Sequence, residues 1–264
     1  MILKGAAREI NAVIAIADRE IMRIKNLGFM IQNIIFPVII LGIMGGSLTQ
    51  NLVGNIGYNY LQFIMIGMIV FNMFAGPISG MTSMITERNK NLTQELYVSP
   101  ISRYTIILGK MIGSSMGSMV TLIGVLIVAS LMQIPFEGMQ ILRLFLIMPS
   151  ICLVGASLGI FFIGFVQDPN VAQMGAILIA MPQMFLSGAI IPISHSTGIL
   201  GFLAKLMPMT YAIDLARGVF YWGNPVYNLA VPHHPLFNAT VMAVFFLIFS
   251  IIGTIMFTKS ERNR

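Results

Sequence analysis

Long apolar runs alternate with short polar connections along this chain. Six runs are long enough to cross a bilayer as helices: residues 27–48, 60–85, 106–132, 142–166, 171–191 and 236–257. A helix of about 20 residues rises ~30 Å, which matches the hydrocarbon core of a membrane. A spanning segment must also satisfy its own backbone hydrogen bonds. The pattern predicts an all-α integral membrane protein, in which residues 1–264 form one domain with six transmembrane helices.

The segment before the first run, residues 6–26, is amphipathic. Its apolar residues recur at three- and four-residue spacing, with charged residues on the other face; they are Ile10, Val13, Ile14, Ala17, Ile21 and Ile24. This spacing predicts an interfacial helix that lies in the plane of the membrane surface. The alternative is a solvated helix that folds onto its own protein.

The most polar part of the chain is residues 87–104, between the second and third runs. Pro100 should end a short helix near Ser99, because the residue before a proline disfavours the helical conformation. A small apolar patch lies among the charges, at Leu92, Leu96 and Val98. We expect a short helix at the membrane surface here.

The long connection 192–235 contains two apolar pieces that are too short to span, residues 198–207 and 210–222. They predict a broken, re-entrant helical hairpin before the last span, and the alternative is two helices lying flat on the surface. Thr210 is a candidate N-cap of the second piece. Asp214 and Arg217 are three residues apart, so they could pair on one helix face; we expect them to compensate each other or to pair across subunits.

Composition and charge agree with a membrane protein and predict its orientation. Hydrophobic residues make up 57% of the chain and charged residues only 9%, against about 25% in soluble domains. The two ends and the connections on their side hold twelve Lys and Arg residues; the other side holds Arg143, Lys205 and Arg217. Because Lys and Arg favour the cytoplasmic side, both termini are expected in the cytoplasm, with the chain in the plasma membrane. No signal-peptide pattern is recognised at the start.

The sequence contains no recognisable nucleotide-binding, metal-binding or catalytic motif. Gly109-Lys110 is followed by Met111 and lacks the upstream glycine of a phosphate-binding loop. His233 and His234 are adjacent and flanked by prolines, which does not favour a metal site, and Cys152 is interpreted as a small apolar filler. We therefore expect no catalytic, cofactor or metal site in this chain.

The ionisable residues of the spans lie near span ends, at Glu87, Lys110, Arg143 and Asp168. Ion-coupled carriers keep such groups at membrane depth, so the pattern disfavours a carrier or channel, and the missing motifs disfavour a membrane enzyme. Both classes stay open as alternatives. Small residues cluster in two runs and are interpreted as helix-packing surfaces; they are Gly113, Ser114, Ser115, Gly117, Ser118, Gly155, Ala156, Ser157 and Gly159.

The order of these elements resembles the permeases of type-2 ABC exporters, and most closely the drug-resistance branch of the daunorubicin-exporter type. One stretch, from Glu87-Arg88 to Gly109-Lys110, is similar to the family's segment that couples to the ATPase. A second stretch is similar to the family's Pro-x-Thr-Tyr-x-x-x-x-x-Arg pattern before the last span. The resemblance assigns coupling to Glu87, Arg88, Leu92, Glu95, Leu96, Val98 and Arg103, and the hairpin pattern to Pro208, Thr210, Tyr211, Asp214 and Arg217.

The resemblance also implies partners. Such permeases pair with a second copy or a close homologue, and they dock on two copies of a separately encoded ABC ATPase that binds ATP and Mg. In this docking contact the apolar patch would be flanked by Arg88 and Glu95, and Glu87 would hold the turn by capping or by pairing with Arg88 or Arg103. The implied function is export of an amphipathic drug-like or lipid-like substrate, with a polysaccharide or lipid-linked glycan as the alternative.

Overall fold

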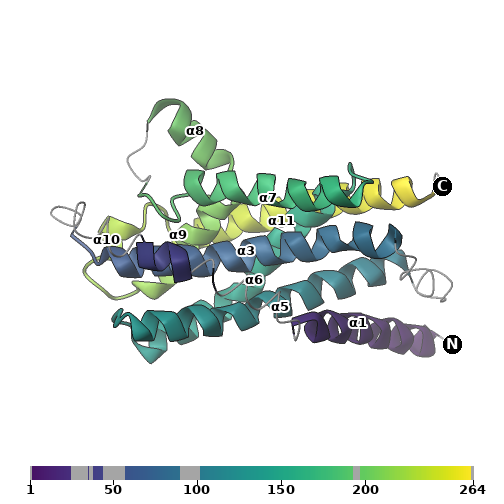
Figure 1. The fold of residues 1–264 in the computed structure, drawn as a ribbon, viewed down its shortest axis with the longest axis horizontal. Helices are drawn as coiled ribbons and strands as arrows, with labels where there is room; N and C mark the ends of the chain where they lie inside the picture. Colours follow the sequence, from purple (N-terminus) through teal and green to yellow (C-terminus); the bar gives the residue numbers. More distant parts are fainter. Residues whose placement is uncertain are drawn as a thin grey trace.

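A computed structural model describes residues 2–24, 35, 38–43, 57–89, 102–192 and 197–262, and these residues form helices and connecting turns without strands. The long helices lie side by side in a bundle (Figure 1). The helices are α1 Ile2–Ile24, α3 Tyr60–Asn89, α5 Arg103–Leu131, α6 Gly138–Ile163, α7 Pro169–Leu186, α8 Gly198–Leu206, α9 Pro208–Phe220, α10 Tyr227–Ala230 and α11 Pro235–Arg262.

Helices that could cross a membrane are confirmed, but their predicted number is not. In the described part of the chain, four segments are long and apolar enough, and the bent pair α8–α9 would raise the number to five. These four contain α3, α5, α6 and α11, which match the second, third, fourth and sixth apolar runs. The fifth run forms α7, which has 18 residues. The run 27–48 lies largely outside the described residues, so the count of six stays a prediction.

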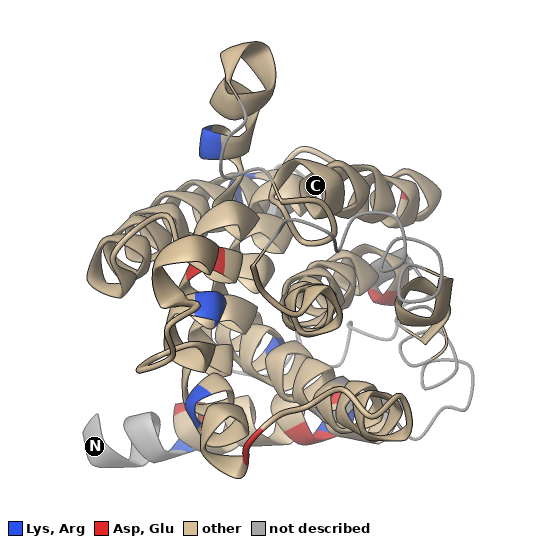
Figure 2. Ribbon diagram, turned by 90° about the vertical axis from the view of Figure 1, so that its left-hand side faces the viewer, with Lys and Arg blue, Asp and Glu red and all other residues tan. Residues whose placement is uncertain are grey.

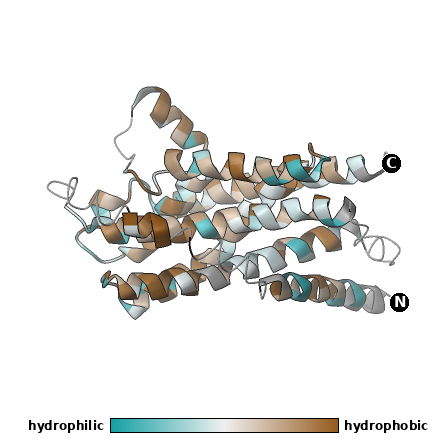
Figure 3. Ribbon diagram, viewed as in Figure 1, coloured by the Kyte–Doolittle hydropathy of each residue, from teal (hydrophilic) through white to brown (hydrophobic). Residues whose placement is uncertain are grey.

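Helix α3 is the centre of the bundle and packs against α5, α6, α7 and α9. Glycine allows the closest of these approaches. A Cβ atom at Gly155 of α6 would lie 2.3 Å from the Phe74 carbonyl oxygen of α3, and one at Gly159 would lie 2.8 Å from the Cβ of Met81. This confirms the packing role predicted for the small residues of α6. Apolar positions predominate along the long helices in Figure 3.

Helix α1 packs against α5, and Figure 2, which looks nearly along the bundle, shows it crossing beneath the other helices. Ile16 and Ala17 are buried, whereas Ile10 and Ile14 on the adjacent stripe are 59% and 53% exposed. The helix thus folds onto its own protein along one side and keeps an exposed apolar stripe beside it. Glu20 is an exception to the general pattern of charged residues on the other face, because its side chain is buried.

The two pieces of the expected hairpin are helices α8 and α9, which meet at an angle of 83°. Helix α9 packs against α3, α6 and α11, while α8 stands off the bundle (Figure 1). The N-cap of α9 is Met207 and Pro208 is its first residue, so Thr210 is not the N-cap that the sequence suggested. Proline suits the first helical position, since its missing N–H would have no partner there. The Thr210 hydroxyl instead donates to the Ala204 carbonyl at 2.6 Å.

Candidate functional site

A buried charged cluster, which we call the α1 junction, joins three helices through Glu20 of α1, Glu87 of α3 and Lys110 of α5. The Lys110 ammonium lies 2.5 Å from a carboxylate oxygen of each glutamate. The side chains of Lys110 and Glu20 are 4% and 7% exposed. Glu87 also accepts a hydrogen bond from the Ser83 hydroxyl and lies 4.0 Å from the half-exposed Arg19. Buried charges are costly unless they are paired in this way.

Glycines on α5 explain how Glu20 reaches Lys110. A Cβ atom at Gly113 would lie 2.7 Å from the Cβ of Glu20 and 2.9 Å from the Cα of Ala17. One turn earlier, a Cβ at Gly109 would lie 2.9 Å from the Cβ of Ile16. Contacts under 3.0 Å would force α1 away from α5, so these two glycines set the distance between the helices.

The N-terminal half of α1 contacts the start of α5 through Glu9. The Glu9 carboxylate accepts hydrogen bonds from the Thr105 hydroxyl and from the backbone N–H of Ser102, the N-cap residue of α5. Both hydrogen bonds lower the pKa of the Glu9 carboxyl below its ordinary value of 4.5, and the one from Thr105 has the larger effect. Glu9 thus binds the first residues that follow the polar connection between α3 and α5.

The proposed coupling residues are only partly visible. Glu87 lies two residues before the end of α3, and its described partners are Lys110, Ser83 and Arg19. Lys110 was not among the partners expected for it. Four of the proposed coupling residues lie outside the described residues: Leu92, Glu95, Leu96 and Val98. The side chains of Arg88 and Arg103 are not described either. The coupling role of this segment stays a prediction.

At the other end of the bundle, Arg217 of α9 is buried against α3 and the turn after α7. Its Nη2 donates to the Gly188 carbonyl at 2.8 Å and to the Phe63 carbonyl at 3.4 Å, and its guanidinium lies 3.3 Å from the centroid of the Phe63 ring. Gly188 has φ +81°, a conformation that favours glycine. Tyr60 fixes the same turn by donating to the Ile190 carbonyl at 3.0 Å. Arg217 therefore fastens α9 to two other elements.

Asp214, one turn earlier on α9, has different partners. One carboxylate oxygen accepts hydrogen bonds from the His233 backbone N–H at 3.1 Å and from the Asn238 side chain at 3.0 Å, and it lies 3.0 Å from Nδ1 of His233. No ion pair joins Asp214 to Arg217 among the described residues, so the pairing suggested by their spacing is wrong for this chain. Asp214 connects α9 to α11 instead.

The remaining hairpin residues support α9 itself. The Tyr211 hydroxyl donates to the Lys205 carbonyl at 2.9 Å, across the bend between α8 and α9. Together with the hydroxyl of Thr210, it binds carbonyl groups at the end of α8, of which that of Ala204 also accepts the Met207 backbone N–H at 3.2 Å. Pro208 begins the helix. The sequence motif therefore corresponds to a bend with its own hydrogen bonds.

Sequence reasoning missed several members of these clusters. Lys110 lies inside an apolar run, which is the usual sign of a functional or paired charge in a span. Asn238 is likewise a polar residue inside an apolar run, near the start of the run 236–257, and it is fully buried. Glu20 occurs at the three- and four-residue spacing of Ile16 and Ala17, so its position on the packed stripe was visible. The described residues hold no group of three or more His, Cys, Asp or Glu side chains that could bind a metal ion.

The fold defines a multi-pass helical membrane protein, and in the described part of the chain the two clusters join its helices through ion pairs and hydrogen bonds of buried charged side chains. Residues 11–221 match the family model described as ABC-2 type transporter. The chain belongs to the ABC-2 type transporter family, whose members form the transmembrane part of transporters that work with an ABC ATPase.

Named relatives agree with this assignment. A protein of Cyanophora paradoxa named as a transport permease, ycf38, is 23% identical over 240 residues, which cover 87% of this chain and 81% of that protein. The inner membrane transport permease YhhJ of Escherichia coli is 28% identical over 57% of this chain and 40% of its own length. ABC transporter G family member 20 of Dictyostelium discoideum is 22% identical over 82% of this chain and 29% of its own length.

Proposed function

We propose that this chain is the permease subunit of an ABC exporter and that ATP energy enters it through residues 89–99. Family membership supports the ATPase partner in general. The observation that carries the coupling role is the α1 junction. Both elements that flank residues 90–101 are linked to α1. Glu87, near the end of α3, lies 4.0 Å from Arg19 and shares Lys110 with Glu20, and the start of α5 is bound through Glu9 and Lys110.

This arrangement suits force transmission. A force that the ATPase applies to the connection between α3 and α5 would act on α1, α3 and α5 together. The reason is that α1 has charged contacts near both ends of this connection. In the proposed contact Leu92, Leu96 and Val98 bind the ATPase, while Arg88 and Glu95 set its register. ATP and Mg are bound by the two ATPase subunits, and the permease pairs with a second copy or a close homologue.

The coupling role is tested with the intact complex, purified from its native membrane through a tag on this chain. Leu96→Asp should lose the ATPase subunits or substrate-stimulated ATP hydrolysis, since an unpaired charge in an apolar contact is costly. Leu229→Asp is the matched control, because Leu229 is 58% exposed on α10 at the far end of the bundle. Retention of both properties by Leu96→Asp would contradict the proposal.

The proposed orientation has six spans with both termini in the cytoplasm, α1 at the inner membrane surface, and α8–α9 re-entering from outside. Its support is the charge count of the connections. Single cysteines on a Cys152→Ala background test it with an impermeant reagent in intact cells. Gly54→Cys and His233→Cys should react, and Asn91→Cys and Ser260→Cys should not. Rapid labelling at position 91 would reverse the orientation.

We propose an amphipathic drug-like or lipid-like molecule as the exported substrate. A glycan would need polar side chains to bind its hydroxyls, but the hydroxyls of Ser114, Ser115 and Ser157 donate to backbone carbonyls of their own helices. Stimulation of ATP hydrolysis by amphipathic drugs or lipids, and not by glycan precursors, is the expected result. The opposite ranking would favour the glycan exporter.

A further inference from the structure

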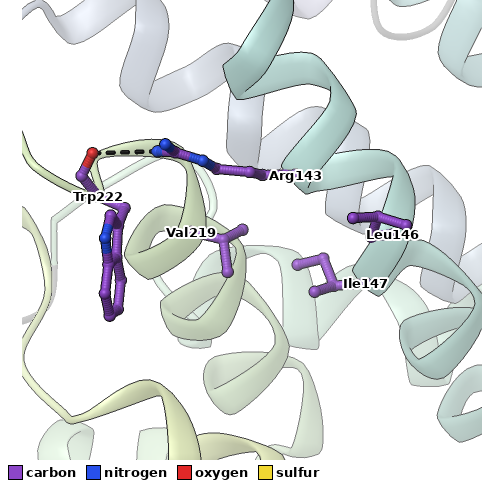
Figure 4. A pocket seen from close by; sticks show the side chains of 5 residues that line it. All are labelled: Arg143, Leu146, Ile147, Val219 and Trp222. Carbon is purple, nitrogen blue, oxygen red and sulfur yellow. Dashed lines mark hydrogen bonds between the residues drawn. The ribbon is translucent and has the colours of Figure 1, made fainter.

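A shallow cavity of about 260 Å³ opens between α6 and the end of α9 (Figure 4); it is lined by Arg143, Leu146, Ile147, Val219 and Trp222. Arg143 donates from Nη1 to the Trp222 carbonyl at 3.1 Å. Within the described part of the chain, this carbonyl is its one hydrogen-bonding partner, and no carboxylate lies within ion-pair distance. A guanidinium has five N–H donors, so most of those of Arg143 remain open to another acceptor.

Arg143 differs in this respect from the buried cations of the molecule. Lys110 is neutralised by two carboxylates, and Arg217 is enclosed by carbonyls and the Phe63 ring. Arg143 is also one of the three cations on the side that the orientation leaves poor in positive charge. A cation without an anion, at the rim of an apolar cavity, is complementary to an anionic amphipathic molecule.

The order of the lining residues matches the layers of a membrane surface. Arg143 lies in the second turn of α6, and Leu146 and Ile147 follow three and four residues later, on the same helix face and further from its end. Val219 lies within the last turn of α9, and Trp222 lies two residues beyond the end of that helix. Tryptophan and arginine occur at the headgroup level of membranes, and aliphatic residues occur below it.

We propose that this cavity binds an anionic membrane lipid, with the phosphate at Arg143 and the start of an acyl chain along Leu146, Ile147 and Val219. Arginine binds phosphate through parallel charge-assisted hydrogen bonds. The cavity is smaller than the ~300–1,000 Å³ of sites that enclose a whole ligand, so the rest of the lipid stays in the bilayer. The proposal rests on the orientation proposed above, which places the lipid in the outer leaflet.

Lipid binding can be followed by intrinsic fluorescence, because Trp222 lines the cavity and is the single tryptophan of the chain. The full-length chain is reconstituted in phosphatidylcholine vesicles containing graded fractions of brominated phosphatidylglycerol or brominated phosphatidylcholine, and quenching of Trp222 fluorescence is measured. The anionic lipid should reach half-quenching at a roughly fivefold lower fraction, the factor that corresponds to about 1 kcal/mol per cation near an anionic surface.

Arg143→Gln should abolish this preference, and Arg143→Lys should keep part of it. Lys205→Gln is the matched control, since Lys205 is an exposed cation on the same side and does not line the cavity; it should keep the full preference. Equal quenching by the two lipids, or an unchanged preference in Arg143→Gln, overturns the proposal. A loss shared by Lys205→Gln also overturns it, because it would show a general surface charge effect. The vesicles contain no ATPase, so this result is independent of the coupling test.

Discussion

The two ends of the bundle handle buried charge in opposite ways. At the α1 junction, opposite charges meet directly, and Lys110 lies 2.5 Å from both Glu20 and Glu87. At the α9 end, Asp214 and Arg217 are one turn apart on the same helix, yet each is bound by other groups. The first cluster depends on charge pairs between helices, and the second depends on carbonyls, an amide and an aromatic ring.

This difference determines how each cluster responds to change. In a charge pair, removal of one member leaves the other buried without compensation, while removal of all members is tolerated much better. A cation held by backbone carbonyls has no partner whose removal can compensate, since the carbonyls remain. The α1 junction should therefore show strong coupling between its residues, and the α9 end should show nearly independent effects.

The largest effect is expected for Lys110→Met, which removes the buried ammonium that Glu20 and Glu87 share. We expect the free energy of unfolding to fall by about 3–5 kcal/mol, measured by SDS-induced unfolding in mixed micelles. Adding Glu20→Gln and Glu87→Gln should restore a large part of this loss. Lys259→Met, at an exposed position of α11, is the control and should change stability by less than about 0.5 kcal/mol. Without recovery in the triple variant, the pairing account would be wrong.

The next effect is expected for Arg217→Leu, which removes the charged donor that the carbonyls of Gly188 and Phe63 share. Hydrogen bonds to charged groups contribute about 1.5–3 kcal/mol, and the same unfolding assay should show a loss of that size. Asp214→Asn combined with Arg217→Leu should deviate less from additivity than the variants of the α1 junction do, since the two side chains share no hydrogen bond and interact only through space. A double variant that is more stable than either single variant would instead support a direct Asp214–Arg217 pair.

A smaller effect tests the steric basis of the α1 junction. Gly113→Ala places a Cβ 2.7 Å from the Cβ of Glu20, so α1 must shift, at a cost of about 1–3 kcal/mol. Gly138→Ala is the matched control, because nothing lies within 4 Å of its added Cβ. Equal unfolding midpoints for these two alanine variants would show that α1 does not depend on this close approach.

The smallest effect concerns pH. The pKa of Glu9 is lowered by its hydrogen bonds to Thr105 and Ser102, so its contribution to α1 docking is present above the ordinary value and is lost as the pH falls through the lowered pKa. Spin labels at Ile14→Cys and Tyr104→Cys, on a Cys152→Ala background, should report a longer distance in acid. Glu9→Gln should make that distance nearly independent of pH, and an unchanged pH response would remove Glu9 from the explanation.

The long helices that the structure describes were predictable from sequence to within a few residues, because long apolar runs bounded by polar residues constrain them strongly. The tertiary contacts between these helices were not predictable from sequence. Glu20 and Lys110 are 90 residues apart, and no local pattern brings them together. For Asp214 and Arg217 the local rule was misleading, since the side chain of Arg217 is directed to α3 and Gly188, where buried carbonyls offer better partners. Thr210 was a reasonable N-cap, but Pro208 was the stronger signal.

The α1 junction also constrains how the chain is assembled during synthesis. Glu87 and Lys110 are 23 residues apart, so α3 and α5 can enter the bilayer together as a hairpin that brings its own neutralising pair. Helix α1 is made first but has its docking surface on α5, which is made much later. It therefore stays undocked until α5 arrives, and at the interfacial position proposed for α1 its exposed Ile10 and Ile14 would hold it at the membrane surface during that time.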